Sequence, residues 1–183
     1  MRAAPLAVTA LAAALLLTGC SSDSDKDSSG SGGDSAAASP GNGTTCRIGD
    51  MDVEVGPANV APGAGDTGDL PVTLTNQSAE CTLAGFPAVD LNAADSSASL
   101  SRAEGATSAK LTLAKGTAAT FTLTYTRGEA GAKASLDVKT LEIGLPGADA
   151  PKSFKWSYGP VQGQGGSADH PTASVGAFTQ AGD

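Results

Sequence analysis

The sequence predicts an all-β domain, an antiparallel β-sandwich of about seven to nine strands, and three observations support this. Short segments that alternate apolar and polar residues, with threonine at many polar positions, recur from residue 46 onward, and this is the pattern of half-buried strands. The breaks between them contain Gly, Pro, Asn and Asp, which favour turns. No segment keeps a helical period. This many short strands in about 135 residues are typical of an immunoglobulin-like sandwich.

The first element is residues 1–19, which we expect to be a lipoprotein signal peptide. Arg2 is followed by an apolar run over residues 3–17, and a positive charge before a short apolar segment is typical of an export signal. The run is shorter than the roughly 20 residues that a membrane-spanning helix needs. The sequence at 17–20, Leu-Thr-Gly-Cys, resembles the lipobox of bacterial lipoproteins, in which lipid is attached to the cysteine thiol and cleavage leaves that cysteine first.

Cys20 is therefore the predicted lipidation site, and the membrane is the predicted partner through that lipid. Two acyl chains are enough for stable anchoring, where a single chain is marginal. The expected location is the extracytoplasmic face of the cell membrane. The alternative is an ordinary signal peptide with a coincidental cysteine.

Residues 20–45 form the second element, a predicted disordered tether. They consist mainly of Ser, Gly, Asp and Ala and contain almost no large apolar side chain, so they cannot bury a core. A flexible coil of this length spans roughly 25 to 30 Å on average, enough to hold a domain off the membrane surface.

Residues 46–183 form the third element, the predicted sandwich. Pro71 lies inside an expected strand, which predicts that this strand is at an edge of its sheet or that Pro71 is near its start. Residues 95–109 are expected to form the longest loop, with at most one short helical turn. The expected strands are Met51–Val55 and residues 70–75, 89–91, 111–113, 121–125, 136–138, 141–143, 154–158 and 173–178.

The three cysteines predict one disulfide. If Cys20 carries lipid, Cys46 and Cys81 remain as an even pair in an exported, oxidising setting. Closing this loop stabilises the fold by roughly 3 to 4 kcal/mol on the chain-entropy model. A reactive free thiol is disfavoured because no histidine lies nearby and there is no Cys-x-x-Cys motif.

Composition argues against nucleic acid as a partner. Without residues 1–19, which contain one basic residue, Arg2, the chain has 10 basic and 19 acidic residues and a formal net charge of −9. Such a surface repels phosphate backbones.

Three aromatic residues alternate along one expected strand, Phe154, Trp156 and Tyr158. If this face were exposed, Trp156 and Tyr158 would offer a ligand platform for sugar rings. Sandwiches commonly bury a strand tryptophan, so the core is the favoured interpretation and the platform is the alternative.

We expect no enzymatic activity, cofactor or metal. His170 is the single histidine, whereas copper and zinc sites of the usual kind need several imidazoles or thiolates. The motifs G-x-S-x-G and S-x-x-K, which mark common serine nucleophiles, are absent.

Residues 74–91, LTNQSAECTLAGFPAVDL, resemble the signature of a domain-of-unknown-function family of secreted actinobacterial lipoproteins. A second segment, LTLAKGTAATFTLTY, is similar to another family motif but has Lys115 where proline is common. The resemblance implies an immunoglobulin-like sandwich anchored at the membrane, with no established activity and no catalytic residues. The matching positions in the first motif are Asn76, Ser78, Cys81, Leu83, Gly85, Phe86 and Pro87.

Together these observations predict a lipid-anchored, non-catalytic β-sandwich that is an interaction or structural module of the bacterial cell envelope. The alternative is a glycan- or small-ligand-binding module at the cell surface. The corresponding partner is an envelope protein or a cell-wall glycan.

Overall fold

The structure is a computed structural model that describes residues 44–59, 62–147 and 150–182, all within the compact unit Pro40–Asp183. The predicted signal peptide, Cys20 and nearly all of the predicted tether lie outside the described residues. In the described part, no helix is long and apolar enough to span a bilayer.

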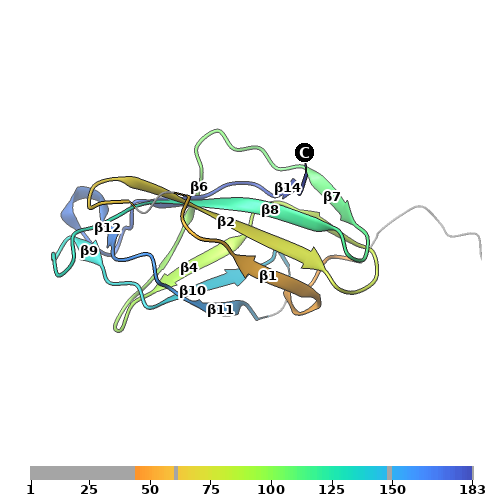
Figure 1. Cartoon of the computed structure of the whole chain (residues 1–183), viewed down its shortest axis with the longest axis horizontal. Coiled ribbons are helices and arrows are strands. Elements are labelled where there is room, and N and C mark those ends of the chain that lie inside the picture. Colours follow the sequence, from red (N-terminus) through yellow and green to blue (C-terminus); the bar gives the residue numbers. More distant parts are fainter. Residues whose placement is uncertain (1–43, 60–61, 148–149, 183) are drawn as a thin grey trace, which may run out of the picture. The chain divides into compact units, whose positions relative to one another are not determined.

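Two main sheets face each other as the layers of a β-sandwich (Figure 1). All of their pairings are antiparallel except that of β13 with β6. The predicted all-β sandwich is therefore confirmed. The first sheet has the order β1 (Met51–Val55), β2 (Thr67–Asn76), β8 (Ala118–Thr126), β13 (Ala173–Val175) and β6 (Ser101–Arg102), and β14 (Thr179–Gln180) also pairs with β8. The second has the order β11 (Lys152–Lys155), β10 (Thr140–Gly144), β4 (Ala88–Asn92) and β5 (Ser97–Ser99).

Two smaller pairings complete the domain, along with two 3₁₀ turns. The described strands number fourteen, more than the expected seven to nine, because several consist of only two or three residues with no alternation to detect. These remaining elements are β3 (Cys81–Ala84) with β7 (Lys110–Leu113), β9 (Ser135–Leu136) with β12 (Val161–Gln162), η1 (Ile48–Asp50) and η2 (Gln164–Gly166).

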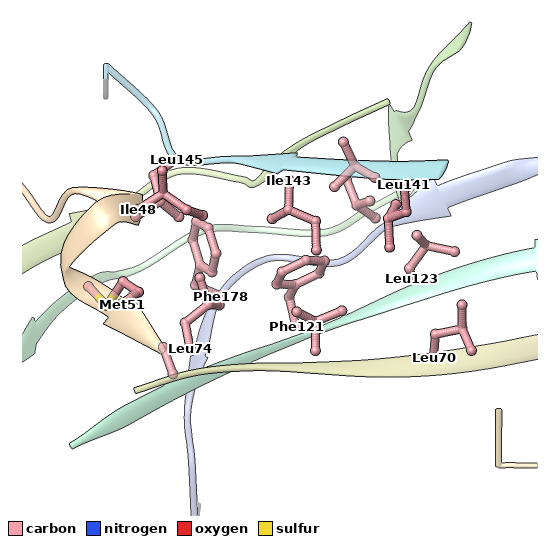
Figure 2. Packing of buried hydrophobic residues seen from close by; sticks show 14 of the residues in the cluster. Ile48, Met51, Leu70, Leu74, Phe121, Leu123, Leu141, Ile143, Leu145 and Phe178 are labelled. Carbon is pink, nitrogen blue, oxygen red and sulfur yellow. The ribbon is translucent and has the colours of Figure 1, made fainter. Parts of the chain in front are cut away.

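The core lies between the two layers and is built by alternation along the long strands. In β2 and β8 the buried pairs are in register, with Leu70 facing Leu123 and Val72 facing Phe121. Burying each such side chain contributes about 1.5 to 3 kcal/mol. Figure 2 shows Phe121 and Leu123 of the first layer lying toward Ile143 and Leu141 of the second layer across the core. Other members from both layers are Leu74, Ala119, Tyr125, Val175, Val89, Leu91, Leu141 and Ile143.

The predicted loop over residues 95–109 is wrong for its first half, which contains β5 and β6. The segment changes sheets, because the backbone N–H of Leu100 donates to Val89 O of β4 (2.8 Å), and that of Ala103 donates to Val175 O of β13 (2.8 Å). The segment therefore adds an edge strand to each sheet, β5 beside β4 and β6 beside β13. Sequence did not reveal these strands because their residues are mostly exposed serines and Ala98 is their single buried side chain.

The predicted edge position of Pro71 is also wrong. β2 pairs with β1 on one side and β8 on the other, and Pro71 lies near its middle, opposite Thr122. The proline is tolerated because β1 ends beside it, where Gly56 N–H donates to Pro71 O (2.8 Å). An antiparallel partner would return a hydrogen bond to Gly56 O, but Pro71 has no N–H.

The expected strands 136–138, 154–158 and 173–178 are each too long. β9 ends at Leu136, and β13 ends at Val175, so that Phe178 lies between β13 and β14. β11 ends at Lys155, which leaves Trp156 and Tyr158 in the segment after it. Their alternation reflects burial in the core. Trp156 N–H still donates to Lys139 O (2.9 Å), but the strand does not reach Tyr158.

Candidate binding site at the tyrosine end of the sandwich

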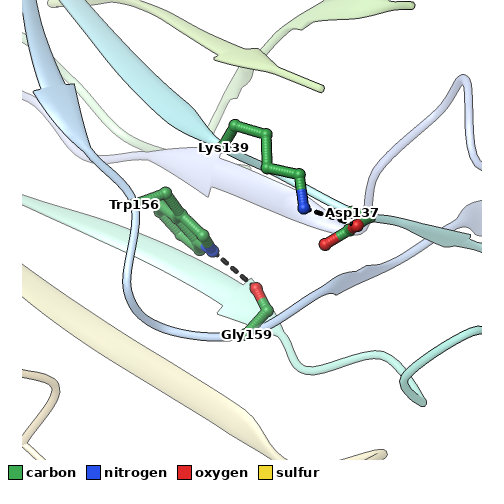
Figure 3. A network of polar contacts seen from close by, with 4 residues as sticks. All are labelled: Asp137, Lys139, Trp156 and Gly159. Atoms are coloured by element: carbon green, nitrogen blue, oxygen red, sulfur yellow. Dashed lines mark hydrogen bonds and ion pairs between the residues drawn. The ribbon is translucent and has the colours of Figure 1, made fainter. Parts of the chain in front are cut away.

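Trp156 lies in the core, with only 5% of its surface exposed. Its indole Nε1–H donates to the carbonyl oxygen of Gly159 (Figure 3). Two tyrosine rings pack edge-on against it, with ring centroids 5.3 Å away for Tyr125 and 4.9 Å for Tyr158. The core interpretation of the tryptophan therefore holds, and any ring surface offered to a ligand belongs to Tyr158 instead.

Both tyrosine hydroxyls act as donors within the domain. Tyr158 is half-buried and its hydroxyl donates to Gly56 O (2.8 Å), the carbonyl that Pro71 leaves without a partner. The Tyr125 hydroxyl donates to Tyr158 O (3.1 Å). Burial raises the pKa of both phenols, and the Arg127 charge partly offsets this for Tyr125. Both groups are therefore protonated at neutral pH and hold the rings in place.

A hollow of about 360 Å³ opens beside these rings. Arg127 lines it from the end of β8, with Nη1–H donating to Pro62 O (3.2 Å). Gly159 has φ near +82°, and any β-carbon there would lie 2.8 Å from Arg127 Cζ, so the guanidinium packs directly on this glycine. The full lining is Pro57, Ala58, Pro62, Tyr125, Arg127, Ser157 and Tyr158.

This arrangement suits binding. The hydrogen bond to Pro62 O uses one of the five N–H donors of Arg127. Within the described part of the chain the other donors have no hydrogen-bond partner, so they can serve an acceptor in the hollow. Proline, alanine and tyrosine surfaces provide an apolar wall, as in most small-ligand sites, where a few polar groups fix orientation. No pattern in the sequence points to Arg127, Pro57 or Pro62 as neighbours, because they come from segments far apart in the chain.

His170 lies elsewhere and is exposed. It lines a separate, mostly polar hollow of about 320 Å³ together with Asp169, Gln164, Ser97 and Ser101. Among residues 44–59, 62–147 and 150–182, no three His, Cys, Asp or Glu side chains converge as a metal site would require.

Cys46 and Cys81 form the predicted disulfide, with their Cα atoms 5.0 Å apart. Cys46 precedes η1 and is not part of a strand. It lies against β3 instead, where its N–H donates to Thr82 O (2.9 Å). The bridge therefore fixes the start of the domain to β3.

The rest of the predicted signature motif forms the adjoining turns. Leu83 is buried in β3, and Gly85 adopts φ near +95°, a conformation that other residues rarely adopt. Pro87 is buried at the start of β4, whereas the Phe86 ring is half-buried. Ser78 contributes its backbone N–H, which donates to Asn76 Oδ1 (3.0 Å). The motif is thus a structural corner.

A family model described as a domain of unknown function, DUF4232, matches residues 46–179. The chain belongs to this family. The DUF4232 match begins at the disulfide cysteine Cys46 and ends within β14, so it covers both layers of the sandwich. No curated protein and no solved structure matches the chain.

Proposed function

We propose that this DUF4232 chain is a non-catalytic interaction module of the bacterial cell envelope, anchored through lipid on Cys20 at the extracytoplasmic face of the cell membrane. The Cys46–Cys81 disulfide supports an exported protein, because disulfides persist mainly in oxidising compartments. The lipobox-like sequence at 17–20 supports the anchor.

The observation that carries the binding role is the hollow between Tyr158 and Arg127. Its volume of about 360 Å³ is within the roughly 300 to 1,000 Å³ of small-ligand sites. A stable protein partner would instead need about 800 Å² of surface on each side. A ring-shaped ligand with hydroxyl or carboxylate acceptors, such as a cell-wall sugar, is therefore favoured over an envelope protein at this site.

Trp156 provides a reporter for this proposal because it is the single tryptophan of the chain and contacts both tyrosine rings. Soluble cell-wall oligosaccharides, titrated into the purified protein, should produce a saturable shift in its fluorescence. Arg127→Gln should weaken the response by about tenfold or more, because a hydrogen bond from a charged donor is lost. Arg127→Lys keeps the charge, so its affinity should lie between that of the natural protein and that of Arg127→Gln.

Lys155→Gln is the matched control, since it removes one positive charge from an exposed position on β11 outside the hollow. It should titrate like the natural protein. If oligosaccharides give no saturable change, and calorimetry detects no binding either, the glycan proposal is wrong. If Arg127→Gln and Lys155→Gln weaken the fluorescence response equally, the effect is one of nonspecific charge, and the glycan proposal is also wrong.

A further inference from the structure

A second, larger hollow of about 430 Å³ lies where the turn over residues 85–87 enters β4. Its wall is firmly held, because β4 pairs with β10 and with β5. It combines apolar and charged side chains, the main ones being Phe86, Leu100, Pro146, Asp90 and Arg102. None of these residues lines the hollow between Tyr158 and Arg127, called the tyrosine hollow below.

Arg102 is the cationic group of this hollow. Its guanidinium lies over the Phe86 ring, with Cζ 4.7 Å from the ring centroid, well within the roughly 6 Å at which the ring attracts a cation. The side chain is exposed and forms no ion pair in the described part of the chain. Stacking restrains the planar fork while leaving its donors free, and this fork matches the two oxygens of a carboxylate.

Asp90 supplies the opposite charge from β4. Its Oδ1 accepts a hydrogen bond from the Ser99 hydroxyl across the β4–β5 pair, which orients the carboxylate. Like Arg102, it forms no ion pair among the described residues. The hollow therefore presents a positive and a negative group that form no ion pair with each other, with apolar surface from Leu100 and Pro146 in the same wall.

We propose that this hollow binds a short zwitterionic peptide. Arg102 pairs with the terminal carboxylate, Asp90 with the terminal ammonium, and an apolar side chain packs against Phe86 and Leu100. Charge complementarity carries the inference, because a ligand of one sign would leave the other charge of the hollow unpaired. The proposal is independent of the glycan site and involves different residues.

The test is calorimetry of the full chain at neutral pH and low salt with three probes, the dipeptide Ala-Leu, its C-terminal amide and its N-acetyl derivative. Free Ala-Leu should bind, the amide should bind about tenfold more weakly or worse, and the acetyl derivative should also be weaker. Arg102→Gln should remove the preference for the free carboxylate. Asp90→Asn should remove the preference for the free amine while keeping an acceptor for Ser99.

Arg102→Lys keeps the charge but loses the planar guanidinium, so this variant should bind Ala-Leu less tightly than the natural protein does. Lys155→Gln and Arg127→Gln should not change dipeptide affinity, which separates this site from the tyrosine hollow. Circular dichroism of each variant excludes unfolding as the cause. Equal binding of Ala-Leu and its amide, no effect of Arg102→Gln, or no binding of any probe at millimolar concentration would each overturn the proposal.

Discussion

At the scale of single residues, Asn76 explains how a polar side chain sits in an apolar core. It is the one fully buried polar residue of the described part, with no exposed surface. Its amide Nδ2 donates to Leu113 O (2.9 Å) and Ala79 O (2.8 Å), and its Oδ1 accepts from Ser78 N–H. Asn76 thus joins the end of β2 to β7 and closes the turn before β3.

Asn76→Ala should destabilise the domain by roughly 2 to 4 kcal/mol, because buried backbone groups lose their partners and a cavity forms. Urea unfolding at neutral pH measures this as a lower midpoint. Gln77→Ala is the control, since it removes an exposed amide side chain next to Asn76 and should change stability by less than about 0.5 kcal/mol. Equal effects of the two changes would contradict the role given to the buried amide.

At the scale of elements, the tolerance of β2 for Pro71 depends on the segment after β11. Pro71 cannot donate to Gly56 O, and the Tyr158 hydroxyl donates to that oxygen instead. A second side chain donates to the backbone of β1 at its other end, where Lys152 Nζ of β11 donates to Met51 O (2.5 Å). β11 and the segment after it therefore hold both ends of β1, the edge strand of the first sheet.

A double-mutant cycle tests the link between Pro71 and Tyr158. Tyr158→Phe should cost about 1 kcal/mol in the natural background, because Gly56 O loses its donor. In a Pro71→Ala background a backbone N–H is restored opposite Gly56, so the same change should cost less. Denaturant unfolding of the four proteins gives the coupling energy. Additive effects would show that the hydroxyl does not substitute for the missing N–H.

At the scale of the whole molecule, the sandwich has a structural corner at the disulfide and, away from it, the two hollows that we propose as binding sites. The hollow beside Tyr158 is at the loop joining β1 to β2, and the hollow beside Phe86 is where the β5–β6 segment passes between the sheets. An interaction module held at a surface could use both, provided that a tether links it to the membrane. The proposed anchor on Cys20 supplies that link.

Cys20→Ser should abolish incorporation of labelled palmitate in a bacterium that processes lipoproteins. Cys46→Ser is the matched control, because it removes a cysteine that we do not expect to carry lipid, and its label should be retained. Label incorporation is a more direct readout than membrane fractionation, since an unprocessed precursor can also stay with the membrane. Labelling of the Cys20→Ser protein would overturn the lipid anchor.

Sequence alone determined the class of fold and most long strands. Alternation between core and solvent repeats every two residues, so Leu70, Val72 and Leu74 identify an inner face without reference to any partner. The disulfide followed from counting cysteines, and the turn at Gly85 followed from the backbone freedom of glycine. These features depend on local sequence or on composition, so they can be predicted from a single sequence.

Only the tertiary structure decided strand order, the β5–β6 crossing and both hollows. The strands of β5 and β6 are mostly exposed serines, so burial leaves no pattern there, and Pro71 is accommodated by a hydroxyl 87 positions away in the chain. Arg127 meets Pro62, and Arg102 meets Phe86, through contacts between distant segments. Such sites arise from where the folded layers bring side chains together, and residue type and spacing do not encode that placement.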